Sequence, residues 1–261
     1  MIDFLGGSEE IKKEIEENEH IRSATDSQSN KSNLLSTFIN RICHKRYEDQ
    51  FDFIVIDEVG QVPLATTLAA TESTKNLVLI GDPQQLPQVK KGSHPNNNGF
   101  TTLEYLVGED VTIQKELGVF LDKTYRLHPT INSFISTFFY DSRLLNDSFT
   151  SQRFLNSFKK PLAPSGIQFI NVDHEGNTQA SFEEIDALEE IIEKLLSSEI
   201  SLGSQVRQLV EEDILIVSPY NLQVYEIGKR LGEKFRVGTV DKFQGQEAPV
   251  VIVSLAASNY E

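Results

Sequence analysis

The stretch FDFIVIDEVGQVP, residues 51–63, decides the fold class, because an unbroken apolar run, Ile54–Ile56, leads directly into two carboxylates, Asp57 and Glu58. The run has no polar alternation, which predicts a strand buried on both faces, as in a parallel sheet covered by helices. Ligands of such sheets bind beyond the carboxyl ends of the strands. The two carboxylates could therefore hold Mg²⁺ on a nucleotide and activate a water molecule. An exposed acidic turn is the alternative interpretation.

A second apolar run, Leu77–Ile80, ends in Gly-Asp-Pro within NLVLIGDPQQLPQV, residues 76–89. The Ala-, Leu- and Thr-containing segment between the two runs is long enough for one short crossover helix. A crossover of this kind joins parallel strands. We therefore expect Asp57 and Gln85 to lie at the same edge of the sheet.

Further strands and helices are expected along the rest of the chain. The segments expected to form strands are 118–126, 166–172, 214–220 and a buried run at 249–257. The expected helices are 34–47, 100–108, 128–144, with Phe134, Phe138 and Phe139 in the core, and 181–198, which opens with a capping box of Ser181 and Glu184. Residues 1–33 are expected to form a polar arm or linker, and 141–165 to be irregular. Strands alternating with helices predict an α/β fold with parallel sheets.

The composition is that of a globular protein, with 39% hydrophobic and 24% charged residues. No apolar run approaches membrane-spanning length and the first residues lack signal-peptide features, so we expect a cytoplasmic protein without a membrane partner. The 39 acidic and 24 basic residues give a net charge of −15. Proteins that bind a phosphate backbone usually carry a basic face, so any such face must be local or lie outside this chain.

Four motifs occur in a fixed order: DEVGQ at 57–61, GDPQQLP at 81–87, TYRLHP at 124–129 and VDKFQGQE at 240–247. They resemble motifs II, III, IV and V of superfamily 1 helicases, in the branch that moves 5′ to 3′. The resemblance is greatest to bacterial helicases linked to RecB-type nucleases. It implies two RecA-like parallel-sheet domains of the P-loop NTPase type at 1–117 and 118–261, both incomplete at the chain ends, with ATP bound in the cleft between them.

The resemblance also assigns roles on the nucleotide side. Asp57 would coordinate Mg²⁺ and Glu58 would activate the hydrolytic water. Gln85 would contact the γ-phosphate, and Arg126 would stabilise charge on the transferred phosphoryl group as an arginine finger. Two residues of the fourth motif would line the nucleotide: Gly245 and Glu247. An exposed ion pair is the alternative role for Arg126.

On the nucleic-acid side, the SPYNLQ turn resembles the family's strand-contacting motif, and Thr239 resembles the hydroxyl that contacts backbone phosphate. The implied nucleic-acid contacts are Pro219, Tyr220, Gln223 and Thr239. Packed positions are the alternatives for Tyr220 and Thr239. Single-stranded DNA is favoured over RNA as the partner, and a linked nuclease is a possible second partner.

The expected phosphate-binding loop, G-x-x-x-x-G-K-[ST], does not occur. Its nearest match, TDSQSNKS at 25–32, lacks both glycines, so we reject Lys31 as the phosphate lysine. The family's second arginine motif is also absent. We therefore expect a fragment of an ATP-dependent helicase, coupling Mg-ATP hydrolysis to translocation and unwinding, that hydrolyses ATP poorly on its own. A catalytically inactive helicase-core remnant that binds nucleic acid or protein, and an ATP-driven switch without unwinding, are the alternatives.

Overall fold

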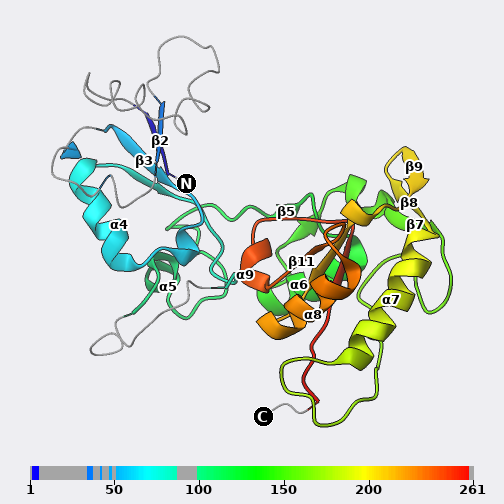
Figure 1. Cartoon of the computed structure of the whole chain (residues 1–261). Coiled ribbons are helices and arrows are strands. Elements are labelled where there is room, and N and C mark those ends of the chain that lie inside the picture. Colours follow the sequence, from blue (N-terminus) through cyan, green and yellow to red (C-terminus); the bar gives the residue numbers. More distant parts are fainter. Residues whose placement is uncertain are drawn as a thin grey trace. The chain divides into compact units, whose positions relative to one another are not determined.

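The computed structural model describes residues 2–5, 34–37, 42, 47–48, 51–86 and 99–258. The chain divides into two compact units, Met1–Phe120 and Leu121–Glu261 (Figure 1), and each is described by itself. Within the described ranges, no helix is both long and apolar enough to cross a lipid bilayer.

Unit 1 contains a four-stranded sheet in the order β2-β1-β3-β4. Its strands are β1 (Ile2–Leu5), β2 (Leu34–Thr37), β3 (Phe53–Ile56) and β4 (Leu77–Leu79). Strands β3 and β4 pair in parallel, as the two apolar runs predict, whereas β1 is antiparallel to both β2 and β3. The connection from β3 to β4 contains the short crossover helix α4 (Leu64–Ala70) between the 3₁₀ turns η2 (Val59–Gln61) and η3 (Thr71–Ser73). Helix α5 (Thr102–Val107) confirms the expected helix at 100–108 and starts with a capping box.

Three expectations for unit 1 are wrong. Residues 34–37 form a strand rather than the start of a helix, and residues 2–5 of the expected polar arm form β1. Pairing with β1 overrides the local helical periodicity at residues 34–37. Strand β3 is also buried on one face only, because side chains alternate between the two faces of a strand: Ile54 and Ile56 are fully buried whereas Phe53 is 45% exposed.

Unit 2 is organised around a parallel sheet in the order β11-β10-β12. Its strands are β10 (Ile214–Val217), β11 (Arg236–Gly238) and β12 (Val250–Val253), and its helices include α7 (Phe182–Leu196), α8 (Asn221–Leu231) and α9 (Val240–Phe243). All four residues of β10 are buried, whereas Val251 and Val253 of β12 are exposed, so the expected burial of the last strand is wrong. Helix α7, expected at 181–198, packs on the sheet through an apolar stripe: Ile185, Leu188, Ile192 and Leu195.

The remaining elements of unit 2 are short. They are β5 (Lys123–Thr124), α6 (Pro129–Phe139), β6 (Leu145–Asn146), η5 (Ser148–Gln152), β7 (Arg153–Ser157), β8 (Glu199–Leu202), β9 (Gln205–Gln208) and η6 (Glu211–Asp213). Strands β7, β8 and β9 form an antiparallel sheet, so 141–165 is more regular than expected. The expected strand at 118–126 is reduced to β5, and 166–172 forms no strand, with Ile167 and Phe169 exposed.

Helix α6 begins at Pro129 as predicted, but its aromatic side chains are not in the core. Phe134 and Phe138 are 47% and 68% exposed, and Phe139 is also exposed. The buried positions are polar: Asn132 Nδ2 donates to Leu144 O at 2.9 Å, and Ser136 Oγ accepts from Leu144 N at 3.1 Å. The helix therefore packs through hydrogen bonds to the segment that precedes β6, rather than through its aromatic stripe.

An ion pair between Asp213 and Arg207 predicts how stability depends on pH. Asp213 is 7% exposed, receives hydrogen bonds from Arg207 Nη1 and Nη2 at 2.5 and 2.7 Å, and also accepts from Val210 N. The hydrogen bonds from Arg207 hold the pKa of Asp213 below its usual value. The carboxylate therefore contributes stability at neutral pH, and this contribution is lost as the pH falls below about 3.9 and through the lowered folded-state pKa.

We expect Asp213→Asn to lower the free energy of unfolding by about 2 kcal/mol at pH 7, because hydrogen bonds to a charged, buried acceptor are lost. Urea unfolding at pH 7 and pH 2 measures this effect. The difference in free energy of unfolding between the variant and the wild type should be smaller at pH 2. Asp186→Asn is the matched control, because the Asp186 side chain is 66% exposed. A difference in free energy of unfolding that is equally large at both pH values would contradict the prediction.

Candidate functional site

The carboxyl ends of β3 and β4 lie side by side in unit 1, and the loops that follow them are joined. Ile80 N donates to Ile56 O at 2.8 Å, and Val59 N donates to Ile80 O at 2.9 Å. A Cβ atom at Gly60 would lie 2.7 Å from the carbonyl oxygen of Asp82, so only glycine allows the two loops to approach this closely. The sequence DEVGQ therefore folds directly against GDPQQ.

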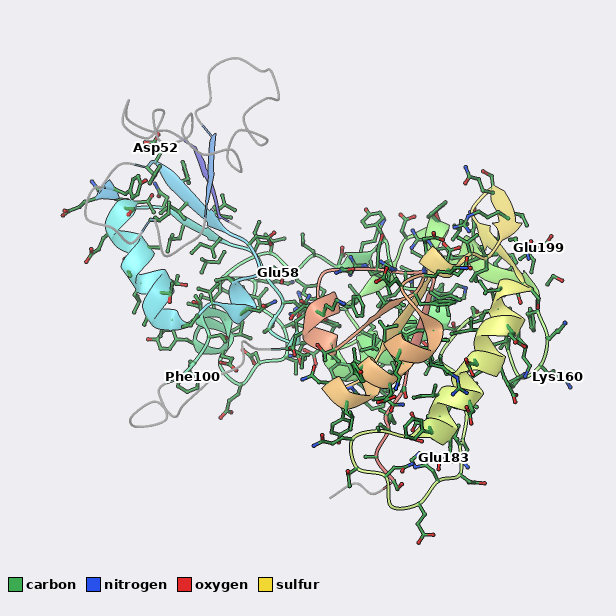
Figure 2. All side chains as sticks on the ribbon, viewed as in Figure 1. Asp52, Glu58, Phe100, Lys160, Glu183 and Glu199 are labelled. Atoms are coloured by element: carbon green, nitrogen blue, oxygen red, sulfur yellow. The ribbon has the colours of Figure 1, made fainter. Side chains whose placement is uncertain are left out.

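Asp57 and Glu58 are both exposed at this edge, where Figure 2 labels Glu58. Glu58 N donates to Asp57 Oδ1 at 2.9 Å, and Glu58 adopts the left-handed conformation, with φ 52° and ψ 36°. This conformation costs a residue with a Cβ atom roughly 1–2 kcal/mol. Backbone strain of this kind is concentrated at functional sites, so the outlier strengthens the case for Glu58 as a functional residue.

Gln85 is exposed on the neighbouring loop, which Asp82 organises. Asp82 Oδ1 accepts from Gln84 N at 3.0 Å, and Asp82 Oδ2 accepts from Gln85 Nε2 at 3.4 Å. Asp57, Glu58 and Gln85 are therefore on two adjacent loops at one edge of the sheet, as the parallel strands predict. Carboxylate and amide oxygens suit Mg²⁺, which is usually held by one or two carboxylates together with phosphate oxygens and water. In the part of the chain that is described, no group of three or more His, Cys, Asp or Glu side chains forms a metal cluster.

In unit 2 the TYRLHP and VDKFQGQE motifs meet through a side-chain ion pair. Arg126 Nε lies 2.7 Å from Glu247 Oε2, and these side chains are 56% and 63% exposed. An ion pair this exposed contributes less than about 1 kcal/mol. The Arg126 guanidinium can therefore exchange the Glu247 carboxylate for another anion at low cost. Gly245, two residues before Glu247, has φ +77°, which favours glycine.

Three of the four candidate nucleic-acid contacts lie at the carboxyl edge of the parallel sheet of unit 2. Pro219 and Tyr220 follow β10, and Thr239 follows β11. The strands are in register at Val217 and Gly238, and Ser218 N donates to Gly238 O at 3.1 Å. Pro219 is exposed, whereas Tyr220 and Thr239 are half-buried at the start of α8 and α9.

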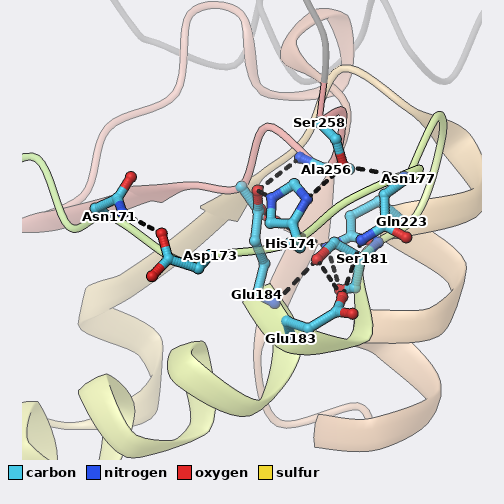
Figure 3. A network of polar contacts seen from close by, with 11 residues as sticks. Asn171, Asp173, His174, Asn177, Ser181, Glu183, Glu184, Gln223, Ala256 and Ser258 are labelled. Carbon is cyan, nitrogen blue, oxygen red and sulfur yellow. Dashed lines mark hydrogen bonds and ion pairs between the residues drawn. The ribbon is translucent and has the colours of Figure 1, made fainter.

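The fourth candidate, Gln223, differs from the other three in its surroundings. Its side chain is fully buried, because the first turn of α8 directs it towards the start of α7 and the end of β12. Gln223 Oε1 accepts from Ser181 N at 2.9 Å, and Nε2 donates to Ser181 O at 3.2 Å and to Ser254 Oγ at 2.8 Å (Figure 3). These contacts occupy both ends of the amide, so in this structure the Gln223 side chain offers no free group to a strand.

Gln223 belongs to a buried polar network that the sequence did not reveal (Figure 3). Its other centre is Glu184, which accepts from Ser254 Oγ at 2.5 Å and from Ala256 N at 3.0 Å, and lies 3.1 Å from His174 Nε2. The capping-box pattern indicated that Glu184 would reach back to Ser181 N, but Gln223 takes that N–H instead. The partners of Glu184 that follow β12 are 70 and 72 residues away, so no local pattern indicates them.

Comparison with known proteins agrees with this arrangement. Two family models, both described as an AAA domain, match residues 6–91 and 101–261. The DNA polymerase alpha-associated DNA helicase A of Schizosaccharomyces pombe is 30% identical over 229 residues, covering 80% of this chain and 33% of that protein. From the same organism, the DNA replication ATP-dependent helicase/nuclease dna2 is 27% identical, covering 80% of this chain and 16% of the relative. Helicase sen1 of the same organism is 29% identical, covering 80% of this chain and 13% of that protein.

This chain thus spans a third or less of the length of each of these relatives. Its mixed α/β architecture with parallel strands is that of the RecA-like P-loop NTPases. The four motifs, the family matches and the helicase relatives lead to one assignment. The chain belongs to the AAA domain family and carries a superfamily 1 helicase core.

Proposed function

We propose that this chain is part of an ATP-dependent helicase that couples Mg-ATP hydrolysis to translocation on a single strand and to duplex unwinding. The main support is the joined edge of β3 and β4, which carries Asp57, Glu58 and Gln85 on loops linked through Val59 N and Ile80 O. The two compact units correspond in this proposal to two RecA-like domains.

In unit 1, Asp57 would hold Mg²⁺, and Glu58 would orient and deprotonate the attacking water. Gln85 would contact the γ-phosphate through its amide. Bound Mg²⁺ would neutralise phosphate charge on the nucleotide. The hydrogen bond from Glu58 N to Asp57 Oδ1 fixes the backbone of Glu58 relative to the Asp57 carboxylate.

In unit 2, Arg126 would supply the positive charge of an arginine finger, and Gly245 and Glu247 would line the nucleotide. The exposed pairing of Arg126 with Glu247 keeps the guanidinium in place at little cost until a phosphate competes for it. Pro219, Tyr220 and Thr239 would contact the strand at the carboxyl edge of β10 and β11.

We propose single-stranded DNA as the track and a nuclease as a linked or separate partner. Support comes from the names of two relatives, a DNA helicase and a replication helicase/nuclease. The net charge of −15 favours one alternative, a helicase core that binds a partner protein without turnover.

Steady-state ATP hydrolysis tests the proposal, with and without single-stranded DNA and RNA. We expect slow turnover by this chain, because its sequence contains no glycine-rich phosphate-binding loop. Any activity stimulated by strands should fall about tenfold or more in Glu58→Gln, because loss of a general base removes the proton acceptor.

Each outcome bears on a different part of the proposal. Vigorous hydrolysis that survives Glu58→Gln would contradict the role of Glu58. Vigorous hydrolysis that Glu58→Gln abolishes would support that role and overturn the expectation of slow turnover. Stimulation by RNA alone would overturn DNA as the track.

A further inference from the structure

Unit 2 contains a pocket of about 430 Å³ beside the VDKFQGQE motif. Helix α8 forms one wall through Gly228, and β11 and α9 form the others, including Arg236, Lys242 and Phe243. Sites for small molecules and cofactors typically have volumes of about 300–1,000 Å³. The pocket is therefore large enough for a ligand of the size of a mononucleotide.

Two cations line this pocket in a strongly acidic chain. Arg236 Nη2 donates to Glu247 O at 3.2 Å, and Lys242 Nζ donates to Val237 O at 3.0 Å. Both acceptors are uncharged carbonyl groups, and within the described ranges neither cation forms an ion pair. Asp213, whose pKa the charge of Arg236 also helps to lower, is already bonded to Arg207 through both carboxylate oxygens.

The guanidinium of Arg236 has unused hydrogen-bonding capacity. Its Nε atom is buried without a hydrogen-bond partner. A buried donor without an acceptor destabilises the folded state by about 1–3 kcal/mol. The acidic lining residue, Glu233, is exposed. Its single negative charge against the positive charges of Arg236 and Lys242 leaves the lining with a net positive charge.

Gly228 contributes no side chain to the pocket wall. It lies inside α8, where glycine is roughly 1 kcal/mol less favourable than alanine. A Cβ atom there would meet nothing within 4 Å, and its φ is not positive, so neither packing nor backbone geometry requires glycine. Glycine at position 228 therefore destabilises helix α8 and leaves free space in the pocket wall.

We propose that this pocket binds a small phosphate ester of mononucleotide size. Arg236 and Lys242 would bind the phosphate, because guanidinium and ammonium groups are the donors that phosphate prefers. Apolar lining residues would contact the organic part: Val224, Phe235 and Val237. The pocket is open to solvent, and its two cations beside apolar side chains suit a small phosphate ester.

Such a site would be separate from the Asp57 edge and independent of Mg²⁺. Isothermal titration of the purified chain with AMP, adenosine and inorganic phosphate in EDTA tests this at low ionic strength. We expect AMP to bind and adenosine to bind at least about tenfold more weakly, because it lacks the phosphate. In Mg²⁺ as in EDTA, Asp57→Asn should leave AMP binding unchanged, which distinguishes this site from the one under Proposed function.

Substitutions at Gly228 provide a matched pair. Gly228→Leu should abolish AMP binding by filling the pocket, whereas Gly228→Ala should retain binding and raise the melting temperature. Arg236→Met and Lys242→Met should each weaken binding about tenfold, and Glu233→Gln should strengthen it. Lys229→Met is the charge control, because Lys229 is on α8 but outside the pocket lining.

The proposal is overturned if AMP does not bind the folded wild-type chain, or if Gly228→Leu binds AMP as the wild type does. Equal affinities for adenosine and AMP would show that the pocket does not recognise the phosphate group. Absence of AMP binding together with (dT)₁₀ binding that Gly228→Leu abolishes would show that the pocket serves a strand instead. Melting curves of each variant establish that loss of binding is not loss of folding.

Discussion

Glu184→Leu is expected to lower the free energy of unfolding of unit 2 by about 4 kcal/mol, the largest effect of any single substitution discussed here. The substitution leaves three groups without their shared acceptor: Ser254 Oγ, Ala256 N and His174 Nε2. Ser254 and Ala256 are buried, so water cannot replace the carboxylate without local unfolding. Ala256 also has φ +64°, and the hydrogen bond from its N–H to Glu184 helps to hold this strained backbone.

Urea unfolding measures this effect, and Glu183→Leu is the matched control on the same helix. Glu183 is exposed, and its carboxylate accepts hydrogen bonds from the side chains of Ser181 and Asn177, so its substitution should change stability little. Glu184→Gln should fall between the wild type and Glu184→Leu, because an amide retains one acceptor but not the charge. A Glu184→Leu variant that unfolds at the wild-type urea concentration would show that the network (Figure 3) contributes nothing to stability.

The parts of the fold that the sequence predicted depend on short-range patterns. The parallel pairing of β3 and β4 follows from two apolar runs separated by one helix, and α7 follows from an apolar stripe with a cap at Ser181. The adjacency of Asp57 and Gln85 on neighbouring loops follows from the same pairing. These features need only the chain's local periodicity and the geometry of a parallel crossover.

The features that the sequence did not predict are contacts between distant segments. The stripe of phenylalanines on α6 has helical spacing, but Asn132 and Ser136 make the packing contacts, with partners after the helix. Residues 34–37 have helical periodicity, yet pair with β1. Gln223 follows the SPYN turn, but its partners are on α7 and after β12, 42 and 31 residues away. Periodicity specifies which face of an element is apolar and does not specify which segment covers it.

Asp57→Asn is expected to reduce the affinity for Mg-ATP about a hundredfold, because the variant lacks the charge that holds Mg²⁺. The asparagine oxygen can still accept the Glu58 N–H that Asp57 Oδ1 accepts at 2.9 Å, so the loop should keep its conformation. Asp52→Asn is the matched control. Asp52 is an exposed aspartate that precedes β3, at the opposite end of the strand from Asp57 (Figure 2).

Equilibrium binding of ATP to the purified chain, in Mg²⁺ and in EDTA, tests the assignment of the β3–β4 edge most directly. We predict a component of ATP binding that requires Mg²⁺, is lost in Asp57→Asn and changes less than about twofold in Asp52→Asn, in addition to any Mg²⁺-independent binding in the pocket of unit 2. An Mg²⁺-dependent component of equal affinity in Asp57→Asn and the wild type, or the absence of any component that EDTA removes, would contradict the assignment.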